Sequence, residues 1–173
     1  QGLYQRQLVR RLIHSAHADG KLAHFAPIAK TAGLIDLVTD QIRELKRLEI
    51  WPEDLQRACE RRPGGCTEKD RELLLLYETY QDVLTRNQLY DREGRFWSAR
   101  TQLRSGQRRP FDKTQFVVVD GFADFTRTQH DILEVLADGV QSLWISLPLE
   151  PDPCRTDLFD KSHRTLVTLR ERH

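Results

Sequence analysis

The stretch that most constrains the fold runs from Gln115 to Gln129 and reads Q-F-V-V-V-D-G-F-A-D-F-T-R-T-Q. Its first part, Phe116 to Val119, is wholly apolar and mostly β-branched. That composition is typical of a strand buried on both faces, as in a parallel sheet. Asp120 ends the strand, and Gly121 follows where the backbone must leave the sheet. The stretch therefore predicts a buried strand with an acidic tip.

A helix and a second strand are predicted next. Thr126 stands where an N-cap is expected, and residues 129–137 continue with helical spacing of apolar side chains. A second strand is predicted over 142–147, after the break at Asp138-Gly139. Such a βαβ unit binds ligands outside the carboxyl ends of its strands. Asp120 is therefore placed to hold a metal ion or a phosphate-bound metal, with a turn-capping role as the alternative.

The remainder of the chain is predicted to be mainly helical. Two strands are too few for a stable sheet, so we expect further strands from a longer parent chain. The absence of Met and the start at Gln1 agree with a fragment. We expect a helical part over 1–107 and a partial α/β part over 108–173. Helical periodicity covers 3–18, 34–48, a stretch from Trp51-Pro52, 67–88, 91–104 and 156–170, with a short helical piece at 24–30, and Arg43, Glu44, Lys46 and Arg47 are predicted to be solvated.

Composition excludes several classes of protein. The formal net charge of +1 over 173 residues gives no global attraction to nucleic acid or membrane, so such contacts must come from local clusters. The longest apolar run is too short to span a bilayer. Three cysteines without a C-x-x-C pair fit a reducing cytoplasm better than a disulfide framework. The histidines show no metal-binding H-E-x-x-H spacing.

A basic cluster precedes the first strand. Arg100 and Arg104 are one helical turn apart, and Arg108 and Arg109 follow at once. Such residues suit contacts with the phosphate backbone of DNA, and a solvated linker is the alternative. Phe96 and Trp97 beside them could stack on bases, although aromatic side chains at this spacing more often belong to a core.

The sequence lacks the phosphate-binding loop G-x-x-x-x-G-K-[S/T] that a nucleotide site of this fold requires. Gly64-Gly65 is followed by Cys66-Thr67-Glu68-Lys69, which has neither the glycine spacing nor a preceding apolar strand. Asp120 alone would supply half of a site. We therefore predict that this segment does not hydrolyse ATP.

The run V-V-V-D-G-F-A-D-F-T-x-x-Q resembles the Walker B motif of superfamily-1 helicases, which is Asp-Glu-Phe-Gln-Asp in active members. More closely, it resembles the degenerate motif in B subunits of bacterial ATP-dependent helicase–nucleases. Gly121 replaces the Glu that activates water. The matching positions are Asp120 for the magnesium-binding Asp, Phe122 for the Phe, Asp124 for the second Asp and Gln129 for a downstream Gln, while Ala123 replaces the Gln.

The resemblance implies a helical insert similar to subdomain 1B, over 1–107, joined to part of a P-loop NTPase-like parallel sheet over 108–173. It implies a cytoplasmic, non-membrane fragment of a helicase-like subunit in double-strand-break repair, with DNA and a helicase subunit as partners. The fragment would bind or scan DNA without catalysis. Magnesium and ATP would be cofactors of the parent protein only, and Asp120 would bind them. The DNA contacts would be Arg100, Arg104, Arg108 and Arg109.

Two alternatives stay open at this point. One is a stand-alone helical scaffold or interaction module in which the Asp120 tip is only structural. Another is a phosphoryl-transfer protein with Asp120 as the acceptor, which generally needs a second acidic residue nearby. Asp124 lies beyond Phe122 and does not clearly meet that need. A parent gene with a P-loop upstream and a nuclease domain downstream would decide between them.

Overall fold

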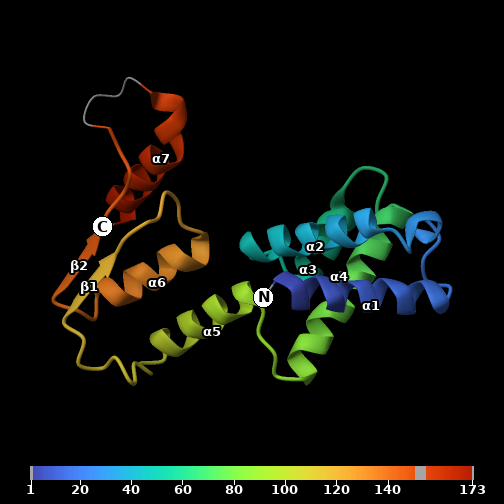
Figure 1. The fold of residues 1–173 in the computed structure, drawn as a ribbon, viewed down its shortest axis with the longest axis horizontal. Coiled ribbons are helices and arrows are strands. Elements are labelled where there is room, and N and C mark those ends of the chain that lie inside the picture. The colour runs from blue at the N-terminus through green and yellow to red at the C-terminus, as the bar shows by residue number, and fades with distance from the viewer. Residues whose placement is uncertain (1, 151–154, 173) are drawn as a thin grey trace. The chain divides into compact units, whose positions relative to one another are not determined.

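The structure is a computed structural model that describes residues 2–150 and 155–172 (Figure 1). Within these residues the chain forms seven α-helices, one short 3-10 helix and two strands, so it is predominantly helical with an α/β portion. It divides into two compact units, one ending at Arg95 and the other starting at Phe96. Both strands lie after Pro110, as the sequence predicts.

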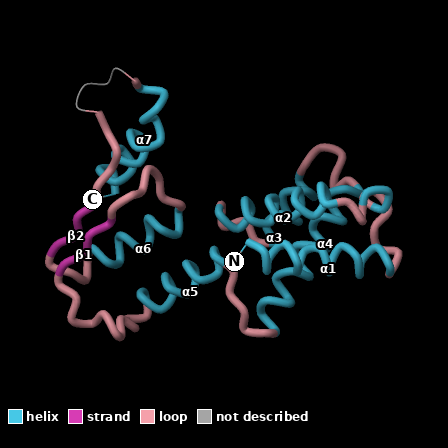
Figure 2. The backbone as a smooth tube through the Cα atoms, in the orientation of Figure 1, coloured by secondary structure: helices cyan, strands magenta, loops and turns pink. Residues whose placement is uncertain are grey.

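The first unit is a helical bundle (Figure 2). Its apolar side chains recur every three or four residues, so each helix turns one stripe toward a shared core. Helix α1 packs against α2 and α4, and α3 packs against α4. The elements are α1 (Gly2–Ala18), the 3-10 helix η1 (Ala26–Ile28), α2 (Ala32–Arg47), α3 (Pro52–Arg61), α4 (Glu68–Arg86) and the start of α5 (Arg92–Arg104). The core includes Val9, Ile13, Leu34, Val38, Ile42, Leu76, Tyr77 and Tyr80.

Glu72 on α4 holds the connection between α1 and η1. Its buried carboxylate accepts backbone N–H bonds from Ala23 and His24, both at 2.6 Å, and from Phe25 at 2.9 Å. Burial alone would raise the pKa of Glu72, but the three donors outweigh it and hold the pKa below its ordinary value. The charged form of Glu72 is therefore part of the fold of this unit.

Lys46 departs from the sequence prediction, which placed it on a solvated face of α2. Its side chain is only 1% exposed, because its ammonium lies 2.7 Å from the Asp91 carboxylate and 2.7 Å from the Gln81 amide oxygen. The hydroxyl of Tyr80 also donates to Asp91, at 2.9 Å. The prediction was wrong because apolar periodicity does not register a buried charge that finds a partner elsewhere in the chain.

The second unit contains the βαβ unit that the sequence predicts. Strand β1 (Phe116–Val119) pairs in parallel with β2 (Ser142–Ile145), and α6 (Arg127–Ala137) connects them. Helix α7 (Thr156–Arg172) follows. The predicted N-cap is confirmed, since the Thr126 hydroxyl accepts from the Gln129 N–H at 3.3 Å while the Gln129 side chain accepts from the Thr126 N–H at 2.8 Å.

One prediction about β1 is wrong: the strand is not buried on both faces. Val117 and Val119 are half-buried on the face that α6 covers, whereas Phe116, Val118 and the neighbouring Trp144 are each more than half exposed. An unbroken apolar run predicts cover on both sides, but the second unit places helices against one face of the sheet (Figure 1). The opposite face is therefore open in this chain.

The described helices include none that is both long enough and apolar enough to cross a membrane. Cys59 and Cys66 are free thiols, and Cys154 lies outside the described residues.

Candidate functional site

Asp120 lies exposed at the carboxyl edge of the two-stranded sheet, where the sequence places it. The Ser146 hydroxyl, from the residue after β2, donates to Asp120 Oδ1. The Ser146 N–H continues the strand pairing by donating to the Val119 carbonyl at 2.9 Å. Gly121 adopts a φ of 80°, a left-handed conformation that favours glycine and turns the chain out of the sheet. The two strand ends therefore present one carboxylate and one hydroxyl side by side.

This pair fits only part of a magnesium–nucleotide site. Mg²⁺ is usually held by one or two carboxylates together with phosphate oxygens and water, so Asp120 fits one such ligand. When bound there, the ion would neutralise charge on phosphate oxygens. No cluster of three metal-binding side chains occurs within 2–150 and 155–172. Asp124, the other candidate acidic residue, is exposed on the chain beyond Phe122.

Three arginines of the second unit converge on one carboxylate of α6, that of Asp131. Arg100 donates to Asp131 Oδ2 at 2.9 Å, and the two side chains are 19% and 14% exposed. Arg104, one turn further along α5, lies 3.4 Å from the same oxygen but keeps 55% of its side chain exposed. Arg172 of α7 lies 3.4 Å from Asp131 Oδ1 and donates to Glu134 at 2.8 Å. Asp131 thus joins α5, α6 and α7.

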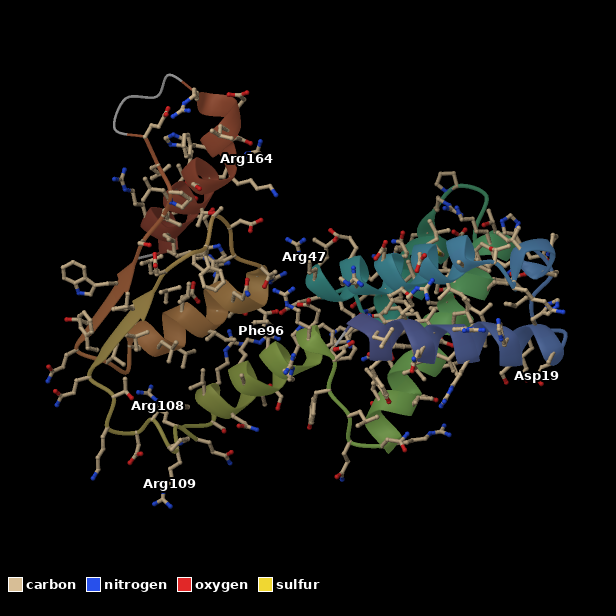
Figure 3. The ribbon with its side chains drawn as sticks, viewed as in Figure 1. Asp19, Arg47, Phe96, Arg108, Arg109 and Arg164 are labelled. Atoms are coloured by element: carbon tan, nitrogen blue, oxygen red, sulfur yellow. The ribbon has the colours of Figure 1, made fainter. Side chains whose placement is uncertain are left out.

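Arg108 and Arg109 differ sharply in their surroundings, although they are adjacent in the chain. Arg108 donates to the Gly139 carbonyl at 3.0 Å, and a Cβ at Gly139 would lie 1.7 Å from its Nη1. Arg109 is exposed, points away from the second unit (Figure 3), and makes no hydrogen bond or ion pair within the described part of the chain. Of the four arginines, Arg104 and Arg109 are therefore the two exposed ones, and Arg104 also has a long contact to Asp131.

The aromatic residues beside the cluster agree with the core alternative. Trp97 is buried and Phe96 is half-buried. Phe111, Asp131 and Arg172 are residues of this region that were not predicted from the sequence. Asp131 and Glu134 are three residues apart on one face of a predicted helix, and this spacing indicates a site for arginine partners. No sequence pattern pointed to Phe111.

The fold defines a mainly helical chain with a parallel βαβ unit and an acidic residue at the carboxyl edge of its sheet. A family model described as "ADDB, N-terminal" matches residues 5–173, and the chain belongs to this family. The resemblance to B subunits of bacterial ATP-dependent helicase–nucleases is thereby confirmed at the level of the family.

The chain is also similar to curated proteins that are named as the B subunit of an ATP-dependent helicase/deoxyribonuclease. It is 27% identical over 149 residues to the protein of Caldanaerobacter subterraneus subsp. tengcongensis, covering 86% of this chain and 12% of that protein. It is 29% identical over 177 residues to that of Moorella thermoacetica, covering 96% and 15%. For Desulfitobacterium hafniense the identity is 29% over 150 residues, covering 86% and 12%. This chain therefore spans less than a sixth of the length of these relatives.

Proposed function

We propose that this chain is a DNA-contacting segment of a helicase–nuclease subunit that acts in double-strand-break repair, and that the segment itself does not hydrolyse ATP. Family membership supports the assignment to the B subunit, since the relatives carry that name. In this proposal residues 1–107 form a helical insert similar to subdomain 1B, and residues 108–173 contribute to a P-loop NTPase-like sheet. DNA and a helicase subunit of the same complex are the partners.

The proposed DNA contact is supported by a difference among the four arginines: two are held by protein partners, and two are exposed. Arg100 and Arg108 have buried or half-buried protein partners that fix α5 and the segment entering β1. Arg104 keeps 55% of its side chain exposed although its guanidinium lies 3.4 Å from Asp131, and Arg109 is exposed beside the same framework. Guanidinium groups bind phosphate oxygens well, and a fixed framework reduces the entropy lost on binding. The proposed DNA surface is therefore centred on Arg104 and Arg109.

The absence of hydrolysis follows from the chemistry at the sheet edge. Asp120 can contribute one ligand to a magnesium ion, but Gly121 has no side chain to activate water. The sequence also lacks the loop that would cradle the phosphates. ATP and magnesium are therefore proposed as cofactors of the parent protein. A cytoplasmic setting is proposed because the three cysteines show no C-x-x-C pair and no disulfide framework in their spacing.

Two assays on the purified chain test the proposal. Fluorescence anisotropy with labelled oligonucleotides at low salt should show weak DNA binding. Phosphate release from ATP with magnesium should equal the buffer blank, with and without DNA. Magnesium-dependent ATP turnover that Asp120→Ala abolishes would contradict the proposed absence of hydrolysis. Undetectable DNA affinity at low salt would contradict the DNA contact.

A further inference from the structure

We propose that a cavity beside the connection from α5 to β1 binds one unpaired base of single-stranded DNA, with Phe111 as its stacking platform. We call it the Phe111 cavity; its apolar wall comprises Leu103, Val117, Leu136 and Val140, and its rim carries Arg109 and Phe111. This inference rests on the proposed DNA contact and deepens it, because it names the form of DNA and the group that is recognised.

The size of the Phe111 cavity matches a small ligand. Its volume is about 330 Å³, at the lower end of the roughly 300–1,000 Å³ that ligand pockets span. A space of this size suits a single base better than a larger stretch of nucleic acid. Gln107 and Thr114 also line the cavity, and their side chains offer hydrogen-bonding groups to the edge of a base.

Phe111 has the exposure expected of a stacking platform. Phe111 is 72% exposed, more than any other Phe, Trp or Tyr of the described residues. An exposed phenylalanine ring is apolar and makes no hydrogen bonds to water. The face of an unpaired base can stack on it, whichever base it is. Bases within a duplex are stacked on one another and do not offer that face. Single-stranded DNA is therefore the form that fits.

The charges around the cavity favour a nucleic acid over an apolar small molecule. Arg109 is exposed two residues before Phe111, and Lys113 is exposed two residues after it. A base on Phe111 would bring its flanking phosphates toward these cations. Arg108, which also lines the cavity, is held against Gly139 and so fixes the wall rather than reaching for phosphate.

The experiment uses the whole 173-residue chain and oligonucleotides that carry the fluorescent base 2-aminopurine, either single-stranded or in a duplex. We expect the single strand to bind more tightly and its fluorescence to be quenched by stacking. Phe111→Ala should weaken single-strand binding about tenfold and remove the quenching. Phe111→Trp, which keeps an aromatic ring, should retain the affinity and the quenching of the parent chain. Arg109→Gln should instead lower the salt dependence of single-strand binding by about 0.7 of a logarithmic slope unit.

Phe116→Ala is the matched control, because Phe116 is also an exposed phenylalanine of this unit but does not line the cavity. Phe111→Leu keeps an apolar side chain without a ring and should behave like Phe111→Ala. If Phe111→Ala binds as the parent chain does, if Phe116→Ala weakens binding as much as Phe111→Ala, or if quenching persists without the ring, the base site is overturned while the DNA contact stands. If the parent chain binds no DNA at low salt, the proposed function itself fails.

Discussion

Asp131 offers the sharpest test of how the second unit is held together. It receives Arg100, Arg104 and Arg172 from two other helices, so Asp131→Asn removes the charge on which all three converge. The asparagine keeps a carbonyl oxygen of similar shape, which limits any change to the loss of charge. We expect the variant to fold and to lose stability.

The size of the effect follows from the three contacts. A hydrogen bond to a charged group contributes roughly 1.5–3 kcal/mol, and the largely buried Arg100 contact at 2.9 Å belongs to that class. The Arg104 contact is longer and more exposed, where ion pairs contribute roughly 0–1 kcal/mol. Arg172 retains Glu134 at 2.8 Å and loses little. We therefore expect the free energy of unfolding to fall by about 2 kcal/mol.

Urea unfolding followed by circular dichroism and tryptophan fluorescence measures this loss. The matched control is Asp160→Asn, which breaks the exposed i,i+4 pair with Arg164 and should cost less than about 0.5 kcal/mol. High salt should reduce the stability loss of Asp160→Asn by a larger fraction than that of Asp131→Asn, because exposed ion pairs are screened more strongly. Equal losses for the two variants would refute the view that Asp131 joins the three helices.

Three further predictions concern stability. Glu72→Gln should destabilise the first unit by about 2 kcal/mol at neutral pH. Because the pKa of Glu72 is lowered in the folded state, its contribution is present above the ordinary value of 4.5 and is lost as pH falls through the folded pKa, so acid titrations of variant and parent should converge at low pH. Gly139→Ala should displace Arg108 and lower the free energy of unfolding by about 1 kcal/mol. Adding Arg108→Gln to this variant should lower it little further, since both changes remove the same contact. Additive losses would refute this. Thr126→Ala should remove the N-cap of α6 and cost about 1 kcal/mol in thermal or urea unfolding, whereas an unchanged midpoint would contradict the cap.

The sequence predicted those features of the fold that depend on neighbouring residues. The strand at Phe116–Val119, the Thr126 cap and the helices of the first unit follow from local periodicity and capping chemistry. Partners distant in sequence were not predictable in this way: the burial of Lys46 depends on Asp91, and the exposure of Val118 depends on what covers the sheet.

The candidate site shows the same limit. Asp120 was placed correctly at the edge because a strand end is a local feature, but its partner Ser146 follows the other strand, β2. The arginine cluster was visible as a charge pattern. Which of its members have protein partners could be seen only once α5 and α6 were placed side by side by the Asp131 contacts. The boundary at 107 and the DNA role of the arginines stay predictions.

The salt dependence of DNA binding tests the central claim most directly. Affinity for a short single strand is measured from low to moderate salt for the parent chain and for Arg104→Gln/Arg109→Gln, which leaves Arg100 and Arg108 in place. The control is Arg10→Gln/Arg11→Gln, which removes the same charge from two exposed residues of α1. Each phosphate contact contributes about 0.7 to the logarithmic slope for a single strand, so the first variant should flatten the slope by about one to two units while the control leaves it unchanged. A slope that the first variant leaves unchanged, or that both variants reduce equally, would contradict a DNA surface centred on Arg104 and Arg109.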